Sequence, residues 1–491
     1  MRLSLNLIFN PGPVAPRPGR RLAFGAGNRL RAPAPPAPPN ASSLPFPTKD
    51  AREKADDIQS GIIDGAMAPD TRGNAIGSAR SPWLPRFALL TAAATLGLIG
   101  VGGLVTSHGA GLAVPDWPNT YGYNMFFFPI SQWVGGVFYE HTHRLLASGV
   151  GLLTAILALW LHGKTARPLM RRLGIILGLA GLAVFAAAPQ RWADGVVALA
   201  TGLALAGAGL VWPASDPAPK WLRRLGLAAF LAVVLQGVLG GLRVVWLKDQ
   251  IGIFHATLAQ LFFALLCALA WLLRKGPRAE GRGPKEARNP NPDSPVSAPS
   301  PKSSFKPRTS DFELRTSNFG LPSALGPRPS AFLSPLLATS LILLQLILGA
   351  TMRHQHAGLA IPDFPLAYGR IWPATDPASV QLYNQRRLEV LAANPITAFQ
   401  IDLQMVHRLM AVVVAAAVGA CVWRLRRGPF RNWAMLWAGL ILAQAGLGAA
   451  TIWSNKAADV ATLHVVTGAL SLAWGTVLSL RCGLETGLEM A

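Results

Sequence analysis

Long apolar runs recur through the whole sequence, and they constrain its fold more than any other feature. Of the 491 residues, 51% are hydrophobic and only 14% are charged. A helix needs about 20 mainly apolar residues to cross about 30 Å of hydrocarbon, and ten runs approach or reach that length. They fall near residues 85–107, 136–161, 171–188, 195–212, 224–246, 251–273, 333–352, 405–424, 433–453 and 460–480. The pattern predicts an all-α polytopic membrane protein.

The distribution of positive charge predicts how these helices are oriented. The formal net charge is +22, but much of the excess lies in an N-terminal tail, a central linker and alternate short loops. The basic loops fall near residues 164–172, 220–224, 274–278 and 424–431. Loops rich in Lys and Arg stay on the cytoplasmic side. We therefore expect the long loops 108–135 and 354–403 to face outward, both termini to lie inside, and no nucleic acid to bind.

Two polar segments flank and divide the apolar runs. Residues 1–80 are rich in Pro, Ala, Gly and Arg, and residues 276–330 are rich in Pro, Ser and Arg. Neither has the periodicity of a packed element, so we expect both to be disordered. The Arg-rich, acid-poor tail resembles a transit peptide, although its dense proline argues against the amphipathic helix of such peptides. Translation from near Met67 explains the tail equally well. A short tail at 483–491 ends the chain.

The two apolar regions carry the same motifs in the same order. Gly-Leu-Ala-Val-Pro-Asp-Trp-Pro at 111–118 corresponds to Gly-Leu-Ala-Ile-Pro-Asp-Phe-Pro at 358–365. Further pairs are His143-Arg144 with His407-Arg408, Gln236 and Gly240 with Gln444 and Gly448, and His255 with His464. We interpret the chain as two parallel copies of a four-helix unit, an N-terminal half (81–275) and a C-terminal half (331–482). The first half carries an extra helical hairpin at about 171–212.

Four histidines occupy equivalent places in this repeat. In the predicted topology His143, His255, His407 and His464 each lie within about two turns of the outer end of a helix, and so at one depth. A single histidine in a membrane helix is usually a hydrogen-bonded structural residue. Four at a matched depth favour axial ligation of haem iron by two imidazoles in each half. Another metal or a proton path is the alternative.

Charged residues next to these histidines indicate further roles. Glu140, His143 and Arg144 share one helix face. Arg144 and its counterpart Arg408 suit haem propionates through bidentate hydrogen bonds, or they reach the interface as ordinary basic side chains. Glu140 corresponds to Gln404, so only the first half has a carboxylate there that can accept a proton. A simple ion pair with Arg144 is the alternative.

Together these residues resemble the haem A synthase family of cytochrome oxidase assembly. The resemblance covers about residues 85–273 and 333–482 and rests on Glu140-His141-Thr142-His143-Arg144, on His407-Arg408 and on the Gln, Gly and His positions above. It implies two four-helix bundles, with haem b bound by His407 and His464 and haem O received by His143 and His255. The implied reaction oxidises a methyl group of haem O to a formyl group, with water as the oxygen source. Glu140 would accept protons or stabilise charge at the reacting carbon.

The resemblance also implies partners and a location. We expect haem O synthase and cytochrome oxidase assembly factors as partners, a homo-oligomer as an option, and a bacterial inner membrane rather than the mitochondrial one. The chain departs from the family in its extra hairpin, its long linker and the lack of a cysteine pair in the first outward loop. Two other classes stay open. A di-haem b electron-transfer protein needs no Glu140, and a parallel-repeat transporter needs polar or broken helices at mid-membrane.

Overall fold

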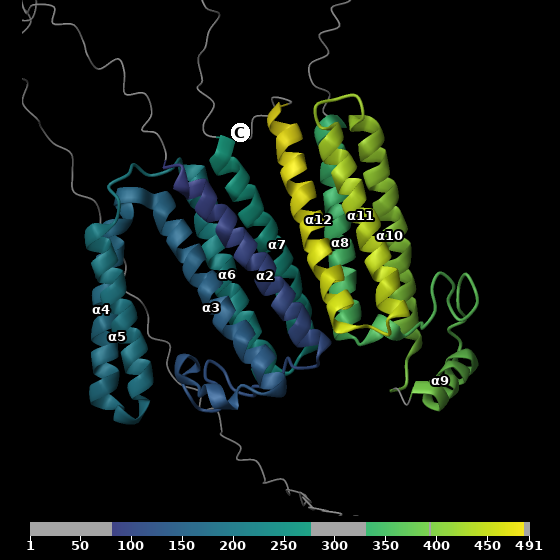
Figure 1. The fold of residues 1–491 in the computed structure, drawn as a ribbon, viewed down its shortest axis with the longest axis horizontal. Coiled ribbons are helices and arrows are strands. Elements are labelled where there is room, and N and C mark those ends of the chain that lie inside the picture. Colours follow the sequence, from purple (N-terminus) through teal and green to yellow (C-terminus); the bar gives the residue numbers. More distant parts are fainter. Residues whose placement is uncertain (1–80, 276–329, 392–393, 486–491) are drawn as a thin grey trace, which may run out of the picture. The chain divides into compact units, whose positions relative to one another are not determined.

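The computed structural model describes residues 81–275, 330–391 and 394–485 (Figure 1). The expected disordered tail (1–80), nearly all of the linker and residues 486–491 lie outside them. The helices are α2 (Trp83–Ser107), α3 (Gly135–His162), α4 (Arg167–Ala187), α5 (Trp192–Val211), α6 (Lys220–Trp246), α7 (Asp249–Lys275), α8 (Ser330–His354), α9 (Pro377–Leu391), α10 (Ala398–Leu425), α11 (Arg431–Trp453) and α12 (Ala458–Glu485). Short 3-10 helices are η1 (Met125–Phe127), η2 (Ile130–Gln132), η3 (Gly163–Ala166), η4 (Pro189–Arg191) and η5 (Ala357–Leu359).

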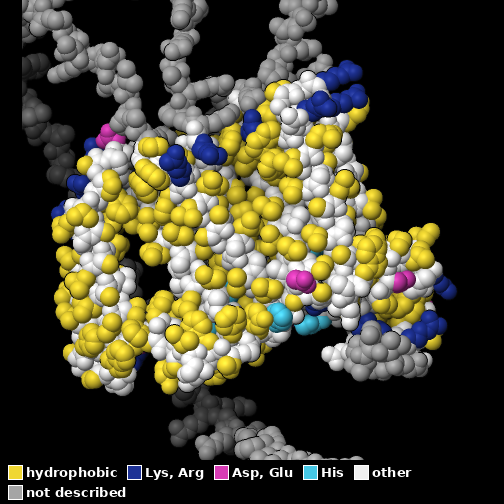
Figure 2. Space-filling model, in the orientation of Figure 1, with side chains coloured by type: hydrophobic (Ala, Val, Ile, Leu, Met, Phe, Trp, Pro, Cys, Tyr) yellow, Lys and Arg dark blue, Asp and Glu magenta, His cyan; other side chains and the backbone are white. Residues whose placement is uncertain are grey.

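The predicted fold class, an all-α polytopic membrane protein, is confirmed. Within the described residues, 9 stretches are long and apolar enough to cross a membrane. One of them, Gly135–Ala187, runs through both α3 and α4, so it contains two of the runs predicted from the sequence. On the face shown in Figure 2, hydrophobic side chains cover most of the helical surface, while Lys and Arg gather along the top of the view and near α9. Such a surface suits a hydrocarbon environment between two polar boundaries.

Eight of the helices form two rings of four. In the first ring α2 packs against α3, α3 against α6, α6 against α7, and α7 back against α2. In the second ring α8 packs against α10, α10 against α11, α11 against α12, and α12 back against α8. The rings meet where α12 contacts α2 and α7, and where α7 contacts α8. Each helix of the first ring therefore has a counterpart in the second.

Helices α4 and α5 form a hairpin that the second ring lacks, at the place where the extra hairpin was expected. Their backbones approach closely, because a Cβ on Gly202 would lie only 2.3 Å from the backbone nitrogen of Gly178. Small residues allow such an approach between membrane helices. The Asn124 amide donates to Asp194 Oδ1 at 2.8 Å and so joins the hairpin to the loop that precedes α3.

The apolar core lies toward the helix ends that are away from the long loops. The largest side chains that are fully buried there include Leu157 and Leu161 of α3, Leu269 of α7 and Trp437 of α11. The Trp437 indole donates to the Ser471 carbonyl at 2.9 Å, which satisfies its one polar group. The opposite ends, which carry the long loops, hold the four candidate histidines and the buried contacts of Glu140 and Gln404. We call these the long-loop ends.

The second long loop contains α9, which the sequence did not predict because the segment has no apolar run. The Tyr383 ring of α9 stacks on Tyr368 of the same loop, with the ring centroids 3.7 Å apart. The loop ends at Thr397, which forms a capping box with Gln400 and so starts α10. The cap defines where the helix that carries His407 begins.

Candidate functional site

Each of the four candidate histidines lies over a glycine of the neighbouring helix in its ring. A Cβ added to these glycines would lie 3.0 to 3.4 Å from the imidazole Cε1 atom, which is tighter than ordinary contact. The pairs are Gly102 with His143, Gly240 with His255, Gly349 with His407, and Gly448 with His464. The absence of a side chain lets each ring lie close to a helix backbone. The structure thus gives all four imidazoles the same packing environment.

Each imidazole pair retains nitrogen atoms that no protein group satisfies. The buried Nδ1 atoms of His143, His255 and His407 have no hydrogen-bond partner among the described residues. Nδ1 of His464 lies 3.1 Å from the carbonyl oxygen of Gln444. A neutral imidazole has one N–H and one lone-pair nitrogen, and the lone pair is what ligates a metal. Two such rings on facing helices form a donor set that fits haem iron.

The residues do not assemble a site for a bare metal ion. Among residues 81–275, 330–391 and 394–485, no three His, Cys, Asp or Glu side chains come together in a way that could hold one. Protein-bound zinc, for example, usually takes three or four protein ligands. A haem needs only the two axial ligands, because the porphyrin supplies the others. Of the two kinds of metal group considered from the sequence, haem fits these residues better.

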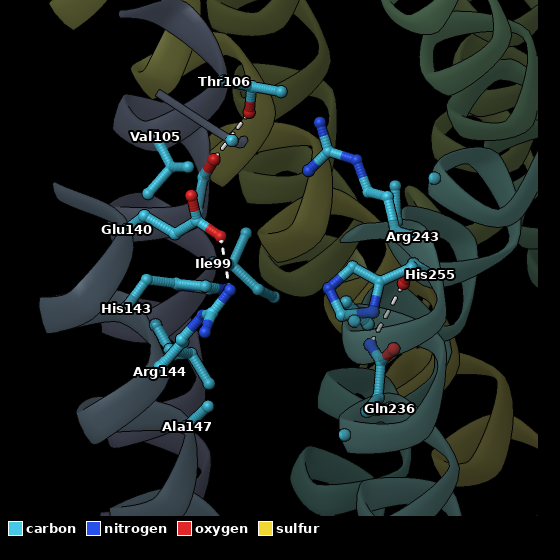
Figure 3. A pocket seen from close by; sticks show the side chains of 18 of the residues that line it. Ile99, Val105, Thr106, Glu140, His143, Arg144, Ala147, Gln236, Arg243 and His255 are labelled. Carbon is cyan, nitrogen blue, oxygen red and sulfur yellow. Dashed lines mark hydrogen bonds and ion pairs between the residues drawn. The ribbon is translucent and has the colours of Figure 1, made fainter. Parts of the chain in front are cut away.

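A cavity of about 350 Å³ lies between His143 and His255 in the first ring (Figure 3). The Gln236 amide lines it and donates to the His255 carbonyl at 3.0 Å. The second ring contributes as well, because Arg353 of α8 lies in the wall. The cavity expected within the N-terminal half alone is therefore shared between the two halves. Other residues in its wall include Trp117, Glu140, Arg144, Arg243, His354 and Val465.

Glu140 is buried, and both of its oxygens have protein partners. Oε1 accepts a hydrogen bond from Arg144 at 2.9 Å in an i, i+4 ion pair, and Oε2 accepts one from the Val114 backbone N–H at 2.9 Å. In the second ring Gln404 Oε1 accepts from the Ile361 N–H at 2.7 Å. Val114 and Ile361 are equivalent in the repeat, so Glu140 and Gln404 each bind the equivalent residue of the long loop in their own ring. The ion pair considered from the sequence is present, and the proton-accepting role stays a prediction.

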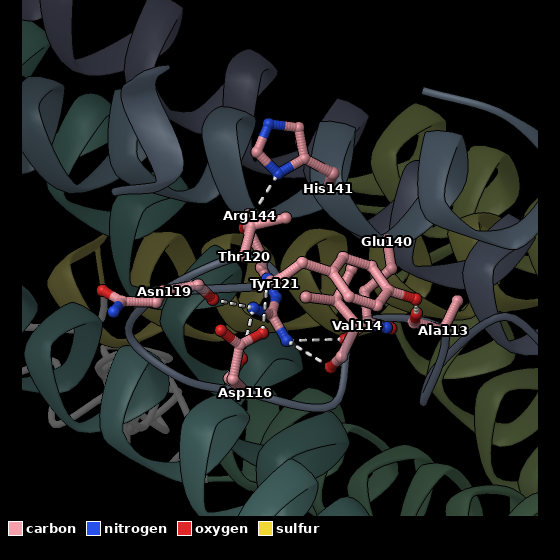
Figure 4. A network of polar contacts seen from close by, with 9 residues as sticks. All are labelled: Ala113, Val114, Asp116, Asn119, Thr120, Tyr121, Glu140, His141 and Arg144. Atoms are coloured by element: carbon pink, nitrogen blue, oxygen red, sulfur yellow. Dashed lines mark hydrogen bonds and ion pairs between the residues drawn. The ribbon is translucent and has the colours of Figure 1, made fainter. Parts of the chain in front are cut away.

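Arg144 holds the first long loop in place (Figure 4). Nη1 donates to the carbonyls of Asp116 at 2.7 Å and Asn119 at 2.9 Å. Nη2 donates to the Val114 carbonyl at 2.9 Å and to Glu140. All four terminal N–H groups are thereby used, which leaves Nε as the one donor that could meet a ligand. Its predicted contact with a propionate stays a prediction.

Arg408 holds the second long loop with fewer hydrogen bonds. Nη1 donates to the Leu366 carbonyl at 3.0 Å, and Nη2 donates to the Asp363 carbonyl at 2.7 Å. Its Nε is buried and has no partner among the described residues. Arg408 therefore keeps donors that a bound carboxylate could use, and this role also stays a prediction.

Asp116 and Asp363 close the same turn in the two long loops. Each carboxylate accepts hydrogen bonds of 2.7 to 2.9 Å from the backbone N–H groups of the Tyr-Gly pair that follows it, Tyr121-Gly122 or Tyr368-Gly369. Burial raises the pKa of Tyr368 to about 12. Its hydroxyl therefore stays protonated and donates to the Ala360 carbonyl over the physiological pH range.

Asp116→Ala should destabilise the protein, because it removes both acceptors from this turn. At about 1 kcal/mol for each hydrogen bond, we expect a loss of about 2 kcal/mol, measured as a lower thermal midpoint in detergent. Asp363→Ala should have a similar effect. Asp216→Ala is the control, because Asp216 pairs with Lys164 on an exposed surface. Equal midpoints for Asp116→Ala and Asp216→Ala would contradict this role.

The sequence alone does not indicate the surroundings of three polar residues, which are His141, Arg243 and Arg353. His141 is fully buried, with Nδ1 3.1 Å from the Thr120 hydroxyl and its ring against Phe128 and Trp133. Its buried Nε2 has no hydrogen-bond partner among the described residues. Arg243 and Arg353 were not singled out, although both line the cavity. An arginine inside an apolar run was the signal that could have identified Arg243, because such a charge is costly in a membrane.

Comparisons with known proteins match part of the chain. A family model described as cytochrome oxidase assembly protein matches residues 321–476, which include His407 and His464. Two curated relatives, the heme A synthases of Anaplasma marginale strains Florida and St. Maries, are each 29% identical over 167 residues. These residues are 34% of this chain and 45% of each relative, so the match spans less than half of the relatives' length.

Proposed function

The family match and the two relatives support the haem A synthase family for this chain, and on that premise we propose that it is a haem A synthase. Such an enzyme oxidises a methyl group of haem O to the formyl group of haem A. One observation carries the proposal. The two rings hold equivalent pairs of imidazoles, but the first ring has a carboxylate, Glu140, in the wall between its pair, where the second ring has Gln404 at the equivalent position.

In this proposal the second ring binds haem b permanently. His407 and His464 would hold it, and a haem bound there would supply a centre for one-electron transfer. Gln345 supports this site by donating to the His407 carbonyl at 3.0 Å. The Gln444 amide lies 3.5 Å from Nε2 of His464. Groups that orient the ligands from behind typically contribute tenfold or more to the affinity of a metal site.

The first ring would bind the substrate, haem O. His143 and His255 face each other across the cavity and would hold the porphyrin between them. Conversion of the methyl group to a formyl group consumes water and releases protons and electrons in equal numbers. Glu140 would accept a proton at the cavity wall or stabilise positive charge at the reacting carbon. Arg144 would keep the carboxylate oriented through their ion pair.

A second candidate function is a di-haem b electron-transfer protein. The specific observation in its favour is that Glu140 and Gln404 hold equivalent loop positions, so Glu140 has a structural role that needs no chemistry. This candidate predicts two permanently bound haems b, neither of which is chemically modified. It offers no reason for a carboxylate at the position where the second ring has Gln404.

We also propose the setting in which the enzyme works. The basic loops support an orientation with both termini in the cytoplasm of a bacterial cell and the long-loop ends of the helices facing outward. The mitochondrial inner membrane is the alternative. Haem O synthase would supply the substrate, and cytochrome oxidase assembly factors would receive the product.

Coexpression with a haem O synthase tests the proposed function. Haems extracted from the cells and separated by chromatography should include haem A only when the intact chain is present. An empty vector and a variant with both His143 and His255 replaced by Ala are the controls. If haem O accumulates unchanged while the purified protein holds two equivalents of haem b, the electron-transfer function is correct.

A further inference from the structure

Arg243 lies near the long-loop end of α6, and its side chain lines the cavity across from Glu140 (Figure 3). Its guanidinium makes no hydrogen bond and no ion pair with any described residue. It lies against the loop before α3, because a Cβ on Gly111 would come within 2.7 Å of Nη2. Gly111 therefore leaves room for a guanidinium that has no hydrogen-bonded acidic partner among the described residues. A charge in this setting is costly unless a ligand pairs with it.

Arg353 brings a second cation to the same cavity from the other ring. Its Nη2 donates to the Gly103 carbonyl at 2.7 Å and to the Ser107 hydroxyl at 3.0 Å, both at the end of α2. These partners are neutral, so they position the guanidinium without balancing its charge. Nη1 and Nε form no hydrogen bond with the described residues. Arg353 therefore retains donors for a ligand in the cavity.

The charges in the cavity wall do not balance. Among the described residues that line it, Glu140 is the one acid, and Arg144, Arg243 and Arg353 are the arginines. Glu140 is paired with Arg144 at 2.9 Å. Arg243 and Arg353 form no ion pair with any described residue, although Glu140 and Asp249 attract Arg243 from a greater distance. A ligand that carries two carboxylates would match them, one carboxylate to each arginine.

The repeat shows that this charge belongs to one cavity and is not a packing requirement of the fold. The counterpart of Arg243 in the second ring is Thr451, and the counterpart of Arg353 in the first ring is Thr106. Both threonine hydroxyls donate to a carbonyl of their own helix, Leu447 at 2.8 Å and Gly102 at 2.6 Å. Threonine therefore satisfies the same helix positions without a ligand. The two arginines are the exceptions, and both face the same cavity.

We propose that Arg243 and Arg353 bind the two carboxylates of the ligand that enters the first-ring cavity. The inference rests on the proposed function, in which that ligand is haem O and the carboxylates are its propionates. Arg144 then holds the first long loop in place, while Arg243 from the first ring and Arg353 from the second orient the substrate. The propionates point toward the long-loop end of the cavity. Porphyrins whose carboxylates are masked should bind poorly.

Ligand titration of the purified full chain tests this binding role. The probes are iron protoporphyrin IX and its dimethyl ester, followed by the Soret absorbance change after the second ring has been saturated. Arg243→Gln and Arg353→Gln should each weaken binding of the diacid by roughly tenfold or more, and the lysine variants should recover part of it. The ester should bind weakly to the unmodified chain, with an affinity that neither substitution changes.

Two controls make the result interpretable. Arg426→Gln removes an arginine that packs over Trp423 far along the chain, and it should leave the Kd for the diacid unchanged. Retention of the haem held by His407 and His464 shows that each variant is folded. Equal Kd values for diacid and ester in the unmodified chain, or an unchanged Kd for the diacid in both Gln variants, would overturn the proposal. If the arginine variants lose diacid affinity but coexpression yields no haem A, the binding role stands and the proposed reaction fails.

Discussion

Purified protein in which His407 or His464 is replaced by Ala should have lost its stably bound haem b. Each substitution removes one of the two axial ligands proposed for the second ring, and the neighbouring groups cannot replace it. Gln345 lies 3.3 Å from Nε2 of His407 through its amide nitrogen, which is a donor and not a metal ligand. Loss of a supporting group behind a ligand already costs 10–100-fold in metal affinity, so loss of a ligand should cost at least as much.

Haem content would be measured by the pyridine haemochrome method and by reduced-minus-oxidised spectra of the purified variants. His356→Ala is the matched control, because His356 is exposed in the second long loop and lies over no helix glycine. Its haem content should equal that of the unmodified chain. If both His407→Ala and His464→Ala keep their full haem content, the assignment of haem b to the second ring is wrong.

The apolar runs and the repeat were enough to predict the membrane-spanning helices and to pair the four histidines. Both signals can be read from a short stretch of sequence. A membrane helix makes its backbone hydrogen bonds within itself, and its apolar composition follows from its contact with lipid. The glycine under each histidine follows from the same repeat, because Gly240 and Gly448 were already matched in sequence. The structure adds that Gly102 lies against the imidazole of His143 and Gly349 against that of His407.

What the sequence could not predict depends on contacts between distant segments. The Glu140 carboxylate accepts from Val114 in a loop 26 residues upstream, and no spacing rule indicates that bond. Arg353 reaches the first-ring cavity from the other half, so a search within one half could not find it. Helix α9 has no apolar run, so the sequence predicts only a loop there.

These findings share one feature: some positions that are equivalent in the repeat carry different residues in the two rings. The two rings share the turn closed by an aspartate and the equivalent histidines, so a difference at equivalent positions around them indicates what one ring does that the other does not. Three differences lie at the first-ring cavity: Glu140 where the second ring has Gln404, Arg243 where it has Thr451, and Arg353 supplied from across the ring boundary. A carboxylate and two unpaired cations are what a cavity needs if it turns over an anionic substrate.

Glu140→Gln should therefore keep haem binding but lose turnover. The second ring already shows that a glutamine fits this position, because Gln404 accepts from Ile361 at 2.7 Å as Glu140 does from Val114 at 2.9 Å. The loop and the ligands should stay in place, and only the negative charge is lost. General acid–base catalysis typically contributes 10²–10⁴-fold, so the ratio of haem A to haem O in coexpressing cells should fall by roughly 100-fold or more.

The reverse exchange, Gln404→Glu, is the matched control for this experiment. It adds a carboxylate to the ring that is proposed not to perform chemistry, so haem A formation should not increase. Glu140→Asp separates charge from position, because it keeps the carboxylate but shortens its reach to Val114, and it should retain part of the turnover. Normal haem A production by Glu140→Gln would mean that the Glu140 carboxylate only holds the loop, through its hydrogen bond from Val114. The difference between the rings at this position would then have no chemical meaning, and Arg243 and Arg353 would be the remaining features that distinguish the substrate cavity.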